Sequence, residues 1–175
     1  RKYGCMLSKY KNSISDKALL ETYKKLNIKF EEYPFTENGS DERQFNYPGI
    51  DLPVASIFRS KYGTYPEYHT SLDNFNLVTE KGLTQSLKFV KALIDNIQKK
   101  IIPQNLILCE PQMSKRGLYP TLSNLKTMGS TKKIMNFLQF ADGKNDLKEI
   151  SKIINLNFKK TSYIYRVLKN KKLLI

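Results

Sequence analysis

The order and patterning of the expected elements indicate an α/β domain followed by a small helical domain. Over the first 100 residues, short apolar or alternating segments typical of strands are interspersed with two long segments of helical periodicity. Proline and glycine then interrupt the chain repeatedly. We therefore expect an α/β domain over residues 1–100, an irregular connector over 101–128 that packs on it, and a helical domain over 129–175.

Two strands and a helix are expected at the start of the chain. Residues 4–11, GCMLSKYK, alternate weakly, which indicates a strand. Residues 13–26 predict a helix, because serines that can cap its start precede an apolar stripe at helical spacing. Residues 28–35, IKFEEYPF, alternate apolar and charged side chains, as a half-buried strand does.

Two loops flank a third expected strand. The first loop, residues 36–52, is rich in turn residues, and so is the second, residues 61–74. Between them, PVASIFRS at 53–60 has the β-branched and aromatic content of an interior strand. A long helix is expected from about Thr79 to Lys100, and its apolar positions are Leu83, Leu87, Val90, Leu93, Ile94 and Ile97. Long loops inside compact domains are often functional.

The C-terminal segment predicts three helices, over residues 131–143, 146–155 and 158–175. Only the short stretch LNF joins the second to the third. Three helices with a short second turn are typical of a winged-helix or helix-turn-helix module.

The net charge of +14 is concentrated at the C-terminal end, where residues 129–175 contain 11 Lys and Arg against three acidic residues. Basic asymmetry of this kind is one property of nucleic-acid-binding domains. The whole chain is also rich in Lys, Asn and Ile, and such a bias raises the charge without any partner. Composition alone leaves both explanations open.

Composition also bears on the compartment of the protein. The sequence has no apolar run of membrane-spanning length and no signal-peptide pattern at its basic N-terminus, so no membrane association is expected. Cys5 and Cys109 form no disulfide framework and no paired zinc motif, and we expect both to be buried thiols in a cytoplasmic, reducing environment. The chain does not begin with Met, which suggests a shortened or processed polypeptide.

The only histidine of the chain, His69, lies in the second loop, in the stretch YPEYHTSLDN. A lone histidine is most often a hydrogen-bonded structural residue. As a metal ligand it would need carboxylate partners, since no second His or Cys pair is available. The carboxylates of the two loops that qualify are Asp41, Glu42, Glu67 and Asp73. Because the loops flank the third strand from opposite ends, they meet only if one folds back over the sheet.

Three stretches, GSDERQF, PGIDLPVASIFRS and YPEYHTSLDN, resemble the C-terminal half of the zinc aminopeptidase superfamily, which includes bacterial leucyl aminopeptidases and glutaminyl cyclases. Together with CEPQMSKRGLYP they are similar to a bacterial family of aminopeptidase-like proteins with a C-terminal winged-helix domain. The similarity runs from Asn38 to the end of the chain. It implies that residues 1–100 are the C-terminal part of a zinc-exopeptidase-like α/β/α domain.

The resemblance also implies roles for five residues. His69 matches the last zinc ligand of the superfamily, in a centre of one or two ions, and Tyr68 matches a catalytic tyrosine whose hydroxyl donates to the developing oxyanion. Asp41 matches an aspartate near the metals. Glu42 stands where the superfamily commonly has histidine, so its role stays open. Arg43 either binds a substrate carboxylate or neutralises Asp41 and Glu42.

The function implied by the resemblance is that of a zinc-dependent aminopeptidase-like hydrolase, which cleaves peptide or amide substrates with metal-activated water. Nothing in residues 1–37 matches the other ligands or the general base, so we expect the chain alone to be inactive and to need a missing N-terminal half.

Two alternatives stay open. The protein is a nucleic-acid-binding or regulatory protein that acts through its winged-helix module, or a pseudoenzyme whose first domain serves as a scaffold for binding. A winged helix can equally bind protein. In the nucleic-acid alternative the expected phosphate contacts are Lys159, Lys160, Arg166 and Lys169.

Overall fold

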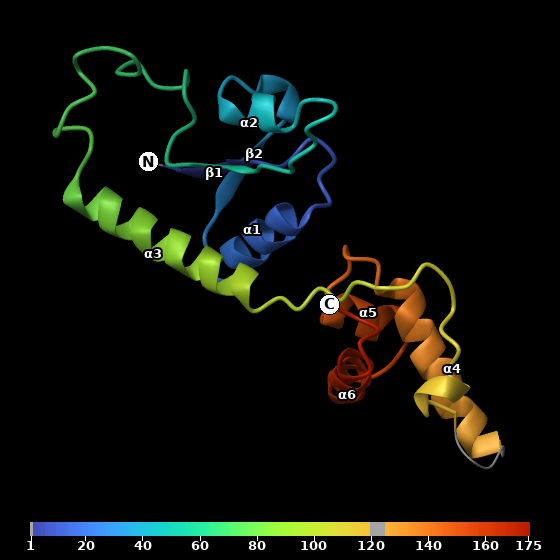
Figure 1. The fold of residues 1–175 in the computed structure, drawn as a ribbon. Helices are drawn as coiled ribbons and strands as arrows, with labels where there is room; N and C mark the ends of the chain where they lie inside the picture. Colours follow the sequence, from blue (N-terminus) through green and yellow to red (C-terminus); the bar gives the residue numbers. More distant parts are fainter. Residues whose placement is uncertain (1, 120–124) are drawn as a thin grey trace. The chain divides into compact units, whose positions relative to one another are not determined.

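The structure is a computed structural model that describes residues 2–119 and 125–175. It divides into two compact units, Arg1–Lys99 and Lys100–Ile175 (Figure 1). The first is an α/β unit and the second is helical, as the sequence predicts. The segment predicted as a separate connector belongs, from residue 101 onward, to the second unit.

The first unit is built on a three-stranded sheet of order β2-β1-β3. The central strand β1 (Tyr3–Met6) is parallel to β2 (Phe30–Tyr33) and antiparallel to β3 (Ser56–Phe58). In its register, Cys5 lies opposite Glu32 on one side and Ile57 on the other. Within the described residues β3 is therefore an edge strand, although its apolar sequence predicts an interior one.

Helices α1 (Ile14–Lys25) and α3 (Glu80–Gln98) pack against each other on the same side of this sheet (Figure 1). A serine caps α1, as the sequence predicts, and it is Ser13, which forms a capping box with Asp16; the Thr79 side chain caps α3. The core between sheet and helices consists of Cys5, Leu7, Leu19, Tyr23 and Phe89.

The first loop of the sequence is more ordered than expected, because it holds the 3₁₀ turn η1 (Phe35–Glu37) and the short helix α2 (Asp41–Phe45). The buried amide of Asn46 fixes its end. Its nitrogen donates to the carbonyls of Glu42, at 2.8 Å, and Val54, at 3.1 Å, and its oxygen accepts from the Lys9 backbone. The loop is thereby tied to the segment that follows β1 and to the segment that leads into β3.

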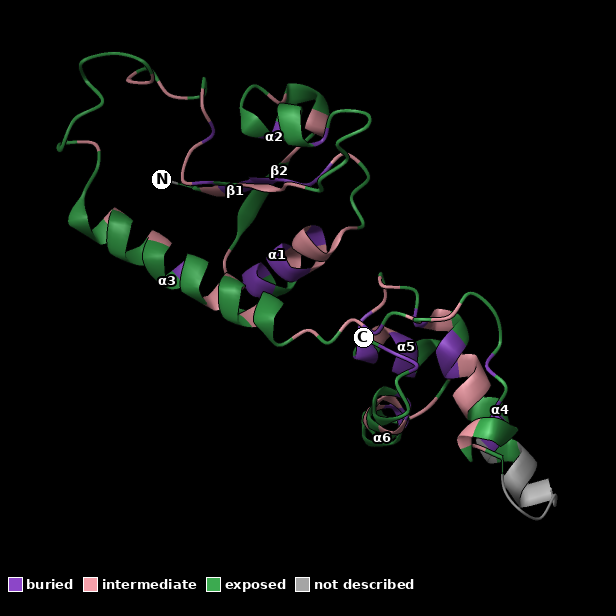
Figure 2. Ribbon diagram, in the orientation of Figure 1, coloured by how far each residue is buried: buried purple, intermediate pink, exposed green. Residues whose placement is uncertain are grey.

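The second unit consists of α4 (Leu125–Phe140), α5 (Leu147–Ile153) and α6 (Phe158–Asn170), with the 3₁₀ turn η2 (Ser114–Arg116) before them. Its core is centred on Phe137, Ile150 and Leu168, which are fully buried (Figure 2). Helix α4 starts before residue 131, where the sequence predicts its beginning, and runs through Gly129 and Ser130.

The start of the expected connector forms the edge of this helical unit. Gln104 pairs with Asp142, and Asn105 pairs with Leu174, in two antiparallel bridges. The Leu106 N–H donates to the carbonyl of Leu173 at 3.0 Å, and Ile107 packs on the helical core. The final residues therefore form an isolated β-bridge with this segment, whereas the sequence predicted that they extend the last helix.

The two cysteines differ in environment. Cys5 is buried in the first core, where burial raises the pKa of its thiol to about 12. Cys109 is exposed, so the expectation that both are buried is wrong for this residue. Among the described residues, no helix combines the length and the apolar character that a bilayer crossing requires.

Candidate functional site

The buried carboxylate of Glu42 holds the first loop, residues 36–52, in place. It is 4% exposed, and its Oε1 accepts hydrogen bonds from the backbone N–H of Gly39 at 2.9 Å and of Ser40 at 3.1 Å. The same oxygen accepts from the Tyr62 hydroxyl at 2.9 Å. Ser56 of β3 donates to the other oxygen, Oε2, at 3.4 Å. Glu42 therefore joins both loops and the strand between them.

These hydrogen bonds determine the protonation states of Glu42 and Tyr62. Burial favours the neutral form of Glu42, but the bonds from Gly39, Tyr62 and Ser40 outweigh it and hold the pKa of the carboxyl below its ordinary value. On the partner side, burial and the bond to Glu42 raise the pKa of Tyr62 to about 12. The pair is thus a carboxylate and a neutral phenol over the physiological pH range.

A series of aromatic contacts leads from this pair to the histidine. The rings of Tyr62 and Tyr68 lie 6.3 Å apart, centroid to centroid. Tyr65 meets Tyr68 edge-on at 5.7 Å, and Tyr68 stacks on the His69 ring at 4.0 Å with the planes 19° apart. Tyr62 therefore brings together the loop of Asp41 and Glu42 and the loop of Tyr68 and His69.

His69 occupies an exposed turn. Its backbone is left-handed, with φ of 58°, and the following residue closes the turn, because the Thr70 hydroxyl donates to the Glu67 carbonyl at 2.8 Å. Such a φ is uncommon outside glycine, although asparagine, aspartate and histidine adopt it more often than other residues. No hydrogen bond from another described residue occupies the imidazole nitrogens. The ring is therefore accessible, which does not match the hydrogen-bonded structural histidine that composition alone favours.

The remaining predicted site residues of the first loop point to solvent. Asp41 and Arg43 are exposed, and no ion pair joins Arg43 to Asp41 or to Glu42. In the described part of the chain, no group of three or more His, Cys, Asp or Glu side chains is placed to hold a metal ion. The carboxylate set considered from the sequence is thus not assembled around His69.

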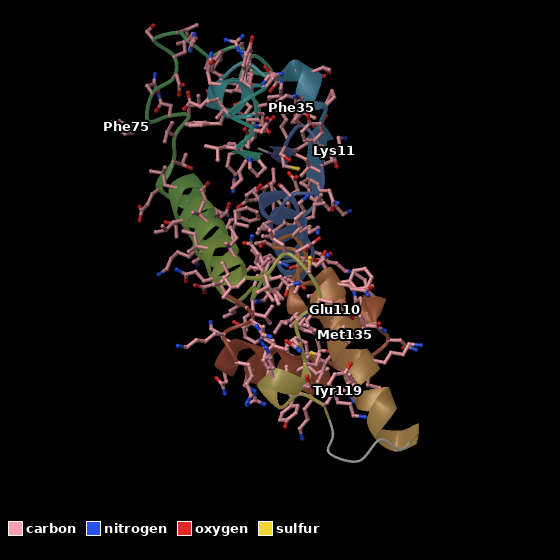
Figure 3. The ribbon with its side chains drawn as sticks, turned by 45° about the vertical axis from the view of Figure 1, so that its right-hand side comes forward. Lys11, Phe35, Phe75, Glu110, Tyr119 and Met135 are labelled. Atoms are coloured by element: carbon pink, nitrogen blue, oxygen red, sulfur yellow. The ribbon has the colours of Figure 1, made fainter. Side chains whose placement is uncertain are left out.

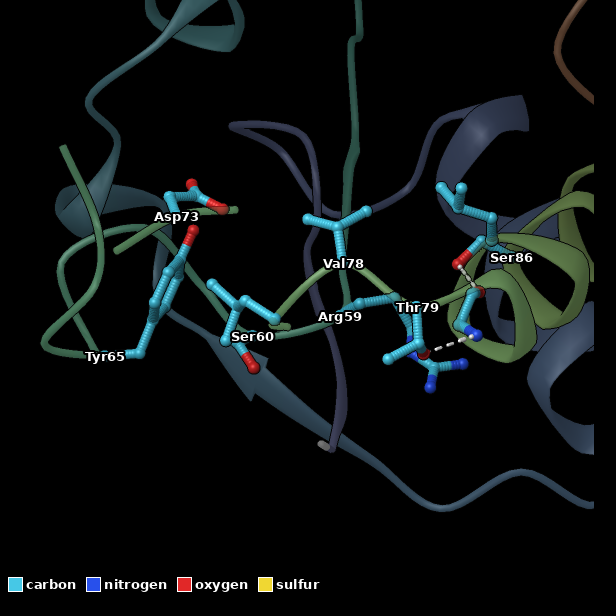
Figure 4. Close-up of a pocket in the computed structure, with 10 residues that line it drawn as sticks. Arg59, Ser60, Tyr65, Asp73, Val78, Thr79 and Ser86 are labelled. Carbon is cyan, nitrogen blue, oxygen red and sulfur yellow. Dashed lines mark hydrogen bonds between the residues drawn. The ribbon is translucent and has the colours of Figure 1, made fainter. Parts of the chain in front are cut away.

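A pocket of about 490 Å³ lies beside the histidine loop (Figure 4). Tyr65 and Asp73 line one side of it, and Thr79 and Ser86, at the start of α3, line the other. Arg59 enters from the end of β3, and its guanidinium is held by the Gln85 side chain at 3.1 Å. The residues that flank Tyr68 and His69 in sequence therefore border a cavity.

In the second unit the predicted phosphate-binding residues all lie on α6. Lys159, Lys160, Arg166 and Lys169 are exposed, whereas Thr161, Ile164 and Leu168 are buried on the opposite face. The helix contains no acidic residue. Lys169 donates to the Tyr165 hydroxyl at 3.1 Å. At 3.6 residues per turn Lys159, Arg166 and Lys169 share one solvent-facing side of α6, whereas Lys160 lies about half a turn from Lys169.

Two residues that organise the site were not identified from sequence. Tyr62 and Asn46 act over long sequence separations, 20 residues for the bond from Tyr62 to Glu42 and 37 for the bond from Lys9 to Asn46. Neither belongs to a stretch that carries the resemblance to aminopeptidases. Only the three-dimensional proximity of the two loops reveals them.

Comparison with known protein families assigns both units. A family described as a domain of unknown function, DUF4910, matches residues 1–100, and the chain belongs to this family. A winged helix-turn-helix family matches residues 101–175. The predicted α/β unit followed by a winged helix is thereby confirmed, and the second match includes the segment predicted as a connector.

Two relatives from Clostridium acetobutylicum extend this assignment. One, provisionally named a polysaccharide biosynthesis protein with an aminopeptidase-like domain, is 40% identical over 139 residues, which is 74% of this chain and 31% of the relative. The other is a crystal structure, provisionally described as a peptidase, that matches with a TM-score of 0.56 and 31% identity over 99% of this chain and 38% of that one. The chain therefore spans about a third of the length of these relatives.

Proposed function

We propose that the protein is the C-terminal part of a zinc-dependent aminopeptidase-like metallohydrolase that cleaves peptide or amide substrates. The observation that carries the proposal is the accessible imidazole of His69, stacked on Tyr68 and connected through Tyr62 to the loop of Glu42. The relatives named for an aminopeptidase-like domain and for a peptidase support it.

This chain can supply one protein ligand of a zinc centre. A neutral imidazole is a common zinc ligand, and the ring of His69 is exposed. Zinc in a catalytic site has three protein ligands and an open position, where it polarises a carbonyl or activates water. Since no group of three or more potential metal ligands gathers among the described residues, the proposal assigns the other ligands and the general base to the rest of a longer polypeptide. This chain alone is expected to be inactive.

The other site residues then have positioning and binding roles. Tyr68, held between Tyr62 and His69, is placed to donate its hydroxyl to the substrate oxygen beside the metal. Glu42 is fully engaged in holding its loop and acts on the site only through Tyr62. Arg43 has no ion pair with its acidic neighbours, which favours its alternative role of binding a substrate carboxylate.

The proposal is tested by the metal content of the protein expressed at the length of its relatives. We expect stoichiometric zinc in the wild type, measured by mass spectrometry of the purified protein, and its loss in His69→Asn. Asparagine is a suitable replacement because it tolerates the left-handed backbone and so removes only the imidazole. Tyr68→Phe is the matched control, which should keep zinc and lose hydrolysis of aminoacyl amides. Zinc binding that survives His69→Asn would refute the role of His69.

A second candidate function, nucleic-acid binding by the winged helix, rests on the exposed basic face of α6. Phosphate contacts from Lys and Arg release counterions, and each contact adds about 0.9 to the slope of log affinity against log salt. We expect Lys159→Gln with Lys160→Gln to reduce that slope on a duplex DNA, as measured by fluorescence anisotropy. The control pair Lys24→Gln with Lys25→Gln, on α1, should leave it unchanged. Equal effects of both pairs would count against this candidate.

A further inference from the structure

Helix α3 has an exposed apolar face. Leu83, Leu87, Val90, Ile94 and Ile97 are spaced by four, three, four and three residues, and each is exposed in the structure. Leu83 and Leu87, at 59% and 61% exposure, are the most accessible of the five. Isolated exposed apolar residues are ordinary on protein surfaces, but a contiguous stripe of this kind marks an interface. We call these five residues the α3 stripe.

The stripe is not the face by which α3 joins its own unit. The helix packs on β1 and α1 through Phe89, which is 1% exposed, and through Leu93. The amide of Asn96 adds hydrogen bonds to α1, on the Ala18 carbonyl and the Thr22 hydroxyl. At 3.6 residues per turn the stripe is centred about a third of a turn away from Phe89. The apolar surface of α3 thus continues sideways from the core instead of standing opposite it.

The apolar surface continues beyond the helix. Leu83 also lines the pocket at the start of α3, beside Leu77 and Val78 of the preceding loop. In the same loop Phe75 is 90% exposed and points away from the unit (Figure 3). The stripe, the pocket wall and the loop therefore form one extended apolar border of the first unit.

The shape of the unit indicates what covers this border. Helix α3 has two apolar faces, the core face and the adjoining stripe. The described three-stranded sheet covers only the core face. A wider sheet, or a neighbouring helix on the same layer, would cover both faces at once. The relatives are about two and a half times as long as this chain, so they contain further polypeptide that could form such an extension.

We propose that the α3 stripe is an intramolecular interface, on which the part of the polypeptide that the longer relatives possess, and this chain does not contain, packs to complete one domain. This inference needs only the length of the relatives and the exposed stripe. It does not depend on zinc or on hydrolysis.

The test compares one pair of substitutions in two settings. The pair Leu87→Asp with Ile94→Asp is introduced into two proteins. One is the 175-residue chain, and the other is a fusion of that chain with the part of a Clostridium acetobutylicum relative that this chain does not match, about two thirds of its length. The control pair, Thr84→Asp with Lys91→Asp, changes exposed positions of the same helix outside the stripe. Thermal unfolding, and the mass in solution by light scattering, are measured for each protein.

In the 175-residue chain both pairs should leave the melting temperature nearly unchanged, since all four side chains are already exposed. In the fusion, the stripe pair alone should lower the melting temperature by about 5 °C or more, because two charges would be buried at an interface. A stripe pair that is as harmless as the control pair in the fusion would overturn the proposal. A homodimer of the 175-residue chain that the stripe pair dissociates would also overturn it, in favour of a second copy as the occupant.

Discussion

The hydroxyl of Tyr62 donates to Oε1 of Glu42 at 2.9 Å, and this bond, beside the ion pair of Lys61 with Glu37 at 3.1 Å, joins the two loops that carry the candidate site. The same oxygen receives the N–H groups of Gly39 and Ser40, so a single buried carboxylate fixes the start of α2 and the approach of the second loop. A carboxylate that accepts three donors is strongly held in place. The geometry around Tyr68 and His69 should therefore depend on a pair that has no part in the chemistry.

The first prediction concerns this hydrogen bond. Tyr62→Phe keeps the ring that contacts Phe58 and Tyr68 but removes the donor to buried Glu42. We expect the free energy of unfolding, from urea titration followed by circular dichroism, to fall by about 1–3 kcal/mol. Tyr47→Phe is the control, because Tyr47 is exposed, and it should change stability by less than about 0.5 kcal/mol. Equal effects of the two substitutions would contradict the structural role of Tyr62.

The second prediction concerns pH. The folded pKa of Glu42 is lowered, so the stability it contributes is complete above the unfolded value of about 4.3 and is lost as the pH falls towards the folded value. Glu42→Gln should be less stable than the wild type at pH 7, and the difference should shrink between about pH 5 and pH 3. The measurement is urea unfolding of both proteins across this range. A difference that stays constant with pH would mean that the carboxylate charge is not what stabilises the loop.

The third prediction tests the close approach of strands at Gly4. A Cβ at this position would lie 2.8 Å from a ring carbon of Tyr33 and 3.3 Å from the Glu31 carbonyl oxygen. The Tyr33 ring is packed edge-on against Phe58, at 5.8 Å between the ring centroids, so its displacement would disturb this contact. Gly4→Ala should therefore destabilise the first unit by about 1–3 kcal/mol, as overpacking does.

Gly129→Ala is the matched control for that substitution. Gly129 lies within α4, and outside the helix backbone no atom of the described residues would lie within 4 Å of its added Cβ. Alanine is favoured over glycine in a helix by about 1 kcal/mol, so this change should stabilise the protein. The two substitutions are chemically identical and are expected to have opposite signs in thermal unfolding. If both substitutions changed stability in the same direction, the contact of the added methyl group with Tyr33 would not be what determines the effect at Gly4.

The elements that the sequence predicted well are those with local signals. The start of α1 follows from Ser13, because an N-cap serine and the acidic residue three positions later bond each other's backbone. The apolar spacing of α3 predicted a helix at the correct place, yet most of that spacing describes the exposed stripe and only Leu93 belongs to the core face. Periodicity shows that a face is apolar, and it does not show what covers the face.

The candidate site could be predicted only in part for the same reason. The sequence motif around Tyr68 and His69 identifies the loop as a candidate site. The structure places the His69 ring at the surface, where a ligand can reach it. What holds the loop in place, the bond from Tyr62 to Glu42, joins residues from different loops and leaves no local pattern in the sequence. Similarly, residues 101–108 read as a connector because their pairing partners, Asp142 and Leu174, lie far along the chain.

The last prediction concerns Asp146, which starts α5 and carries a buried ion pair. Its Oδ1 accepts from the backbone N–H of Lys148 and Glu149, and its Oδ2 receives the ammonium of Lys100 at 2.9 Å. Both side chains of the ion pair are nearly inaccessible, at 8% and 9%. Burial opposes the charge of Asp146, but the bond from Lys100 and the two N–H groups outweigh it and lower its pKa. The carboxylate therefore serves as helix cap and counter-ion at once.

Substitution can separate the two roles. Asp146→Ala removes the cap and leaves a buried cation without its main partner, so the second unit should lose about 3–5 kcal/mol of stability. Asp146→Asn keeps a cap acceptor and should lose less, and Lys100→Met added to Asp146→Asn should recover part of the loss, because no unpaired charge then remains. The exposed pair of Lys11 and Glu32 is the reference, and Lys11→Met should cost less than about 1 kcal/mol. If Asp146→Ala proved as mild as Lys11→Met in urea unfolding, Lys100 would not be held by Asp146, and residue 100 would not be anchored to the winged helix by this pair.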